Sequence, residues 1–188
     1  MGASAAGGST RDYVVMHRKS AGAMFELVSG YKGTADILLA VERGEVDGLC
    51  GLDWSSLKSQ RPDWVRNRTV NILAQINLEP EAELSTLGIP PIWTFIAREE
   101  DKKAAELIVS QQVFGRPYLA PPGVAAEPLA VLRKAFAATL QDKEFLADAE
   151  RTRIDVVASS GERVQQFVEQ LYATPKVTVE RAKELIKP

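Results

Sequence analysis

The chain has 188 residues, of which 45% are hydrophobic and 26% are charged, a balance typical of a globular protein. Its formal net charge of -2 gives no basic excess to neutralise phosphates, so no nucleic-acid partner is expected. The single cysteine, Cys50, and the single histidine, His17, exclude an intramolecular disulfide and leave almost no basis for a Cys/His zinc site. No metal and no cofactor are therefore expected.

Helices and strands alternate along the first half of the chain. The spacing of apolar residues and the capping residues predict helices over 11–20, 35–43 and 54–59, and strands over 24–29, 46–52 and 70–76. Residues 77–91 are rich in proline, glutamate and glycine, and we expect a loop with about one helical turn there. The proline-rich part of this segment, 79–91, is the best candidate for a domain boundary.

The second half is expected to be mostly helical. Helices are predicted over 99–112, 128–140, 160–172 and 178–186, with a further helix capped by Asp142, and short strands over 93–97, 118–120 and 154–157. Strands that alternate with helices of this length favour an α/β layered fold with a largely parallel sheet flanked by helices.

Three predicted turns each open a helix, and they are the candidate binding residues. They are Gly7-Gly8-Ser9-Thr10, Tyr31-Lys32-Gly33-Thr34 and Leu52-Asp53-Trp54-Ser55. In a parallel sheet such turns lie outside the carboxyl ends of the strands, where ligands gather. The unpaired N–H groups and the positive dipole end of a helix start suit a carboxylate. An ordinary capped helix is the better explanation of any one of these turns, so the hypothesis depends on their convergence.

Enzyme chemistry finds little support in the sequence, and we expect a non-enzymatic protein. The first turn lacks the Gly-Lys-Ser/Thr ending of a phosphate-binding loop, and no Gly-x-Ser-x-Gly elbow occurs. His17 is the only histidine that could serve as a base. Two alternatives stay open: a small α/β enzyme or regulatory ligand-binding domain that would use Lys32 or Asp53, and a structural interaction module.

Several motifs occur in an order that resembles one transport family. Residues 2–10 form a glycine- and serine-rich turn, Ser29–Thr34 contains Tyr-Lys-Gly, and the following helix ends in Gly44-Glu45-Val46-Asp47-Gly48. Later segments are an Ala-Pro-Pro-Gly return, a long helix followed by Asp142-Lys143-Glu144-Phe145, and a closing strand and helix over 157–167. This ordered set resembles the extracytoplasmic solute receptors of tripartite tricarboxylate transporters.

The resemblance implies a receptor fragment with an incomplete periplasmic-binding-protein-like (type II) fold. Residues 1–112 would be the second α/β domain, and residues 113–188 a returning helical segment that completes the first. The ligand would be a small carboxylate in an interdomain cleft, and a membrane permease would receive it. The whole protein would be periplasmic, although no signal peptide is visible in this chain.

The positions that match the family's ligand-facing turns are Gly8, Ser9, Thr10, Lys32, Gly33 and Thr34, with Asp53 at a cleft-edge position. The tryptophan-containing stretch that usually precedes the family's Ala-Pro-x-Gly turn is replaced here by Phe114-Gly115-Arg116-Pro117. Within it, Arg116 could bind a carboxylate bidentately.

A returning segment without its partner strands would expose apolar side chains. These are Val131, Leu132, Phe136, Phe145 and Val168. We therefore expect the chain to self-associate or to be poorly soluble.

Overall fold

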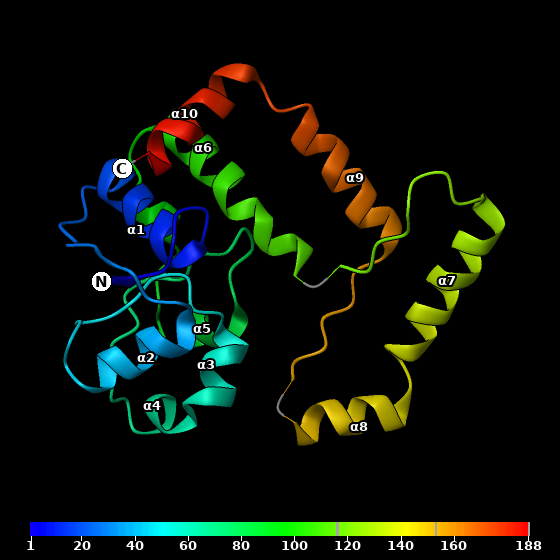
Figure 1. Ribbon diagram of the computed structural model, residues 1–188, viewed down its shortest axis with the longest axis horizontal. Coiled ribbons are helices and arrows are strands. Elements are labelled where there is room, and N and C mark those ends of the chain that lie inside the picture. The colour runs from blue at the N-terminus through cyan, green and yellow to red at the C-terminus, as the bar shows by residue number, and fades with distance from the viewer. Residues whose placement is uncertain (116, 153, 188) are drawn as a thin grey trace. The chain divides into compact units, whose positions relative to one another are not determined.

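The computed structural model describes residues 1–115, 117–152 and 154–187 (Figure 1). Of these described residues, 56% are helical and only 4% are in strands or bridges. The prediction of a layered, sheet-rich fold of the type II binding-protein kind is therefore wrong, because helices dominate the chain.

The sheet consists of two short parallel strands. Strand β1 (Gly2–Ala3) pairs with β2 (Val28–Ser29), so that Gly2 lies opposite Val28 and Ala3 opposite Ser29. On the other side of β1, Gly2 forms an isolated parallel bridge with Leu49. β1 is therefore the centre of a small parallel arrangement.

The other expected strands do not form ladders in the described residues. The predicted strand over 46–52 is reduced to the bridge at Leu49, and that over 70–76 to a bridge between Gln75 and Pro91. Residues 92–95 form a 3-10 helix, and residues 118–120 and 154–157 are irregular. A strand is stabilised by paired neighbours and a buried face. Tyr118 is 84% exposed, so the run over 118–120 has no such face, whereas in the run over 70–76 Ile76 packs against the core but only Gln75 has a bridge partner.

The predicted helices are confirmed with small shifts at their ends. The helices are α1 (Ser9–Ser20), α2 (Thr34–Glu42), α3 (Trp54–Gln60), α4 (Pro62–Arg66), α5 (Ala82–Thr86), α6 (Glu99–Val109), α7 (Ala126–Thr139), α8 (Lys143–Arg151), α9 (Gly161–Tyr172) and α10 (Lys176–Ile186), with 3-10 helices η1 (Ile92–Phe95) and η2 (Ser110–Phe114). The expected cap of α8 is present, because the Asp142 carboxylate accepts a 2.9 Å hydrogen bond from the Phe145 N–H. α4 was not predicted; it begins at Pro62, whose fixed φ suits a first helical position.

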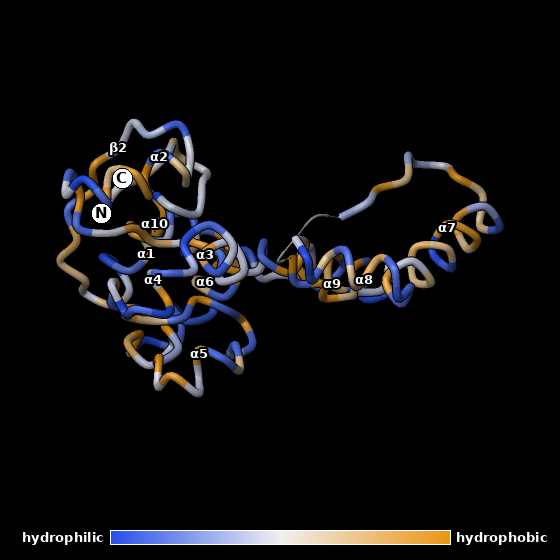
Figure 2. The backbone as a smooth tube through the Cα atoms, turned by 90° about the horizontal axis from the view of Figure 1, so that it is seen from below, coloured by the Kyte–Doolittle hydropathy of each residue, from blue (hydrophilic) through white to orange (hydrophobic). Residues whose placement is uncertain are grey.

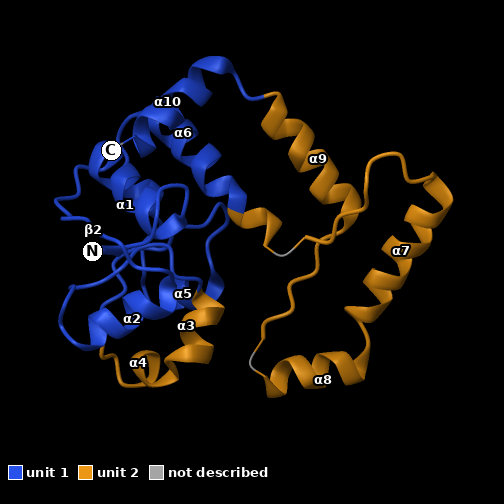
Figure 3. Cartoon of the chain, in the orientation of Figure 1, with its two compact units in different colours: residues 1–53, 70–111, 174–188 blue, residues 54–69, 112–173 orange. Residues whose placement is uncertain are grey.

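The chain divides into two compact units (Figure 3). Unit 1 contains residues 1–53, 70–111 and 174–188, and unit 2 contains residues 54–69 and 112–173. The proline-rich segment 79–91 lies within unit 1, and the longer segment of unit 2 begins at residue 112. The assignment of 1–112 and 113–188 to two receptor domains stays a prediction.

Unit 1 has a continuous apolar core between α1, η1, α6 and α10. It is built from Tyr13, Met16, Ile92, Ile96, Ala104, Ala105, Val109, Ala182 and Leu185. Figure 1 shows α6 and α10 side by side, and both helices pack against α1. An ion pair joins α6 to α10. The Asp101 carboxylate on α6 is 1% exposed and accepts a 2.6 Å hydrogen bond from Arg181 Nε on α10.

Unit 2 has very little core. Among its described residues, the buried hydrophobic side chains are those of Leu57 and Ala149. Aromatic contacts join Phe114 to Phe167 and Tyr118 to Phe136, with ring centroids 5.6 Å and 5.1 Å apart. No described helix in either unit combines the length and hydropathy needed to span a membrane.

Candidate functional site

The three predicted turns lie at one edge of the small sheet. The chain leaves β1, β2 and the bridge residue Leu49 in the same direction, because all three pair in parallel. Residues 4–8 then lead to α1, residues 30–33 to α2 and residues 50–53 to α3. We call residues 4–10, 30–34 and 50–53 the three-turn edge.

The first turn is held by a pair of hydroxyls. The Thr10 hydroxyl accepts a 3.1 Å bond from the Ser4 N–H and lies 2.8 Å from the Ser4 hydroxyl. Thr10 is buried, so its hydroxyl holds the turn rather than facing a ligand. At Gly8, a Cβ atom would lie 2.6 Å from the Ser4 hydroxyl oxygen, so a larger residue here would displace that hydroxyl from Thr10.

The first and third turns touch each other. The Ser9 hydroxyl donates a long 3.4 Å bond to the Gly51 carbonyl oxygen. A Cβ atom on Gly51 would lie 2.9 Å from the Ser9 Cβ, and Gly51 has a φ of 69°. Glycine at this position therefore allows the start of α1 to approach the loop that follows Leu49.

The second turn places an uncapped helix start beside the first. The Tyr31 N–H donates a 3.3 Å bond to the Ala3 carbonyl, which ties the turn to the end of β1. Gly33 precedes α2 with extended backbone, and a Cβ atom added to it would meet no other atom within 4 Å. Thr34 is half-buried, and Lys32 is exposed.

The third turn contributes less to anion binding. Asp53 is exposed and carries the same charge as a carboxylate ligand. α3, which follows it, has only seven residues, and a helix of two turns provides a weak dipole. Arg116, the remaining predicted contact, lies outside the described residues.

Backbone amides and hydroxyls at the three-turn edge could together bind an anion. No side chain caps α1 or α2 within the described chain. The first N–H groups of a helix have no partner inside the helix, so those of α1 and α2 can donate to a carboxylate. The Ser9 hydroxyl can turn from its long bond toward the same anion, and Lys32 can add positive charge at the rim. The site residues as a set remain a prediction.

Two structural residues of the edge were not predicted from the sequence. Ser4 lies within the glycine- and serine-rich segment 2–10 and Gly51 within the predicted strand over 46–52, but neither was among the predicted binding residues. The signal for Ser4 was its spacing of six residues from Thr10 across a glycine-rich turn. Gly51 gave no signal, because its role arises only from the approach of α1 in space.

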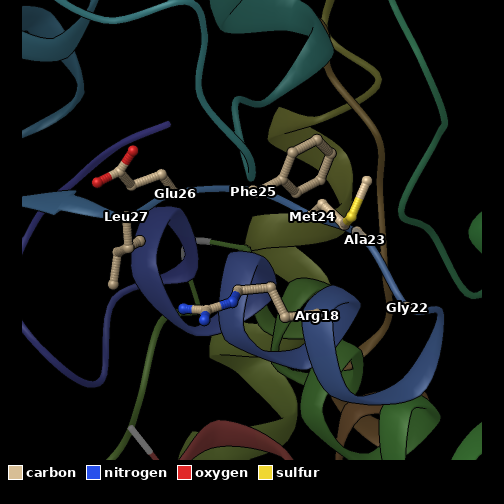
Figure 4. Close-up of a pocket in the computed structure, with 7 residues that line it drawn as sticks. All are labelled: Arg18, Gly22, Ala23, Met24, Phe25, Glu26 and Leu27. Atoms are coloured by element: carbon tan, nitrogen blue, oxygen red, sulfur yellow. The ribbon is translucent and has the colours of Figure 1, made fainter.

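A separate hollow of about 630 Å³ lies on another part of unit 1 (Figure 4). It is lined by Arg18 near the end of α1 and by residues 22–27, which lead into β2. The hollow therefore lies before the amino end of β2, whereas the three-turn edge follows the carboxyl ends of the strands. Met24, at its rim, is 99% exposed.

The single histidine and the single cysteine both lie in unit 1, where His17 is buried and Cys50 is half-buried. Burial raises the pKa of the Cys50 thiol to about 11, so very little thiolate exists at neutral pH. Burial lowers the pKa of His17 from its ordinary value, against an opposing effect of its hydrogen bond with the Tyr13 carbonyl. Within the described residues no group of three or more His, Cys, Asp and Glu could hold a metal ion.

Comparison with known proteins adds no relative. No family model, no curated protein and no solved structure matches the chain.

Proposed function

We propose that this chain binds a small carboxylate at the three-turn edge, without catalysis and without a cofactor, as part of a solute-binding receptor. The observation that carries the proposal is the position of β1 between β2 and Leu49, which directs two helix starts and a third turn to one edge. The ligand would then pass to a membrane permease, and the whole protein would work in the periplasm.

The chemistry of the edge supports an anionic rather than a cationic ligand. The available groups are backbone N–H donors, the Ser9 hydroxyl and the exposed Lys32 ammonium. Each is stabilised by negative charge, and backbone donors at helix starts bind carboxylates and phosphates well. The Asp53 carboxylate at the rim repels negative charge near the third turn. A ligand whose single charged end lies at the starts of α1 and α2 avoids this repulsion, which favours a small carboxylate.

The test is isothermal titration of the purified chain against a panel of mono-, di- and tricarboxylates, with nucleotides and divalent cations as the contrast. We expect saturable binding of one or more carboxylates and no binding of divalent cations. Binding that is confined to nucleotides or to cations would refute the proposal.

Two variants locate the ligand. Gly33→Ala adds a methyl group into open space before α2, so the fold should be unchanged while the ligand is pushed away from the α2 amides. Ser9→Ala removes one hydroxyl donor, and loss of one hydrogen bond to a charged group should weaken binding about tenfold or more.

The matched control is Ser160→Ala, which removes a hydroxyl at the start of α9, where Ser160 accepts a 3.2 Å bond from the Arg163 N–H. Its affinity should equal that of the unmodified chain. If all three variants bind equally well, the carboxylate lies elsewhere.

A further inference from the structure

We propose that unit 1 binds an extended acidic peptide along residues 25–27, which we call the free edge, with a peptide carboxylate at Arg18. The free edge leads into β2 and lines the hollow of about 630 Å³ shown in Figure 4. A peptide added to a sheet as a further strand gains affinity from main-chain hydrogen bonds and specificity from its side chains. This peptide site is separate from the three-turn edge and does not depend on it.

The backbone of the free edge is paired on one side and open on the other. The Met1 amino group donates a 2.6 Å hydrogen bond to the Glu26 carbonyl oxygen, and the Val28 N–H donates a 2.9 Å bond to the Met1 carbonyl oxygen. Backbone groups of successive residues in an extended chain point to opposite edges, so those of Phe25 and Leu27 point away from Met1. Neither of these two backbones has a hydrogen-bond partner among the described residues.

The free edge is accessible to a second strand. Phe25 and Leu27 are half-buried, while Met24 just before them is 99% exposed and Val28 just after them is 43% exposed. Figure 2 shows hydrophobic residues in the chain at β2. An open edge with apolar side chains beside it is a template for pairing with another extended chain.

Arg18 supplies the charge that selects an acidic partner. It lies in the last turn of α1, lines the same hollow and is exposed. Its guanidinium has no hydrogen bond or ion pair with another residue of the described chain. In Figure 4 the Glu26 carboxylate lies on the opposite side of the segment from Arg18, so it does not neutralise this charge. A guanidinium matches a carboxylate bidentately.

The main-chain groups favour a peptide over a small free acid as the occupant. Phe25 and Leu27 each offer one N–H donor and one C=O acceptor, two residues apart on the same edge. A peptide strand has donors and acceptors with the same repeat and can pair with all four groups, whereas a small acid pairs only with donors. An extended peptide with one acidic side chain therefore fits both the free edge and Arg18.

Fluorescence anisotropy of a labelled peptide tests the charge. The probe alternates Val and Thr, is acetylated and amidated, and carries one Asp as its only carboxylate; a second probe has Asn in that place. We expect the Asp probe to bind the whole chain about fivefold or more tighter than the Asn probe. Arg18→Gln should remove this difference. The matched control is Arg163→Gln, on an exposed arginine of α9, which should retain it.

N-methylated probes test the main-chain pairing without altering the protein. Two versions of the Asp probe carry N-methyl groups on alternate amides, one set starting one residue after the other. Only one set faces the free edge, so we expect one version to bind about tenfold or more weaker than the other.

Three outcomes would overturn the proposal. One is the absence of saturable binding of the Asp probe at concentrations up to about 1 mM. Another is a preference for Asp over Asn that persists in Arg18→Gln or is lost equally in Arg163→Gln. The third is equal affinity of the two N-methylated versions.

Discussion

Replacing Gly51 with alanine should destabilise unit 1 much more than replacing Gly44, although the two glycines have the same backbone conformation. Gly51 has a φ of 69° and Gly44 a φ of 70°, so each alanine must adopt the left-handed region. This conformation costs about 1–2 kcal/mol for a residue with a Cβ. The two variants therefore share this cost.

They differ in what the new methyl group meets. At Gly44 nothing lies within 4 Å, whereas at Gly51 the Cβ would lie 2.9 Å from Ser9 Cβ and 3.0 Å from the Ser9 carbonyl carbon. The second atom is backbone, so α1 itself must shift. Overpacking of this kind costs about 1–3 kcal/mol. We expect Gly51→Ala to lower the free energy of unfolding by about 2–5 kcal/mol, and Gly44→Ala by about 1–2 kcal/mol.

Urea denaturation followed by circular dichroism measures both values under one set of conditions. The difference between the variants, about 1–3 kcal/mol, is the quantity that reports the approach of the first and third turns. If Gly51→Ala lowers the free energy of unfolding no more than Gly44→Ala does, the start of α1 does not contact the loop after Leu49. The first and third turns of the three-turn edge would then not be in contact.

Three further predictions concern the core of unit 1. Arg181→Met should lower the free energy of unfolding by about 2–4 kcal/mol in urea denaturation, because it leaves the buried Asp101 carboxylate with weaker compensation, and Arg181→Lys should recover part of this loss. Leu185→Ala should cost about 2–4 kcal/mol, because this side chain is fully buried, and a loss below 1 kcal/mol would contradict its place in the core. Burial lowers the pKa of His17 in the folded state, so the unfolded chain binds the proton more tightly. The free energy of unfolding should therefore keep the full contribution of neutral His17 above about pH 6.5 and lose it as the pH falls from there toward the pKa of the folded state. In His17→Gln this part of the pH dependence should vanish.

Local sequence signals located the helices well and the strands poorly. A helix satisfies its backbone hydrogen bonds within itself, so the apolar spacing of α6 and the Asp142 cap of α8 were sufficient. A strand needs a partner that the local sequence does not specify. The run over 70–76 has the composition of a strand, yet only Gln75 pairs, and its partner Pro91 has no N–H with which to extend a ladder.

The central strand of unit 1, β1, forms a ladder although its sequence does not resemble a strand. Gly2 and Ala3 have almost no side-chain pattern, and they form β1 because only small residues fit beneath α2. A Cβ atom on Gly2 would lie 2.7 Å from the Ile37 side chain. The candidate turns followed from helix-start signals that a sequence does carry, whereas the contact between Ser9 and Gly51 depends on how distant segments pack.

α10 completes the core of unit 1 from the far end of the chain. Leu185 and Ala182 lie in that core, and the Ile186 carbonyl accepts a 2.5 Å bond from Arg11. During synthesis on the ribosome, the segments of unit 1 made first must wait until residues 176–186 emerge before their apolar surfaces are covered. In that interval these surfaces stay uncovered and prone to aggregation, so the core of unit 1 can be completed only after nearly the whole chain has been made.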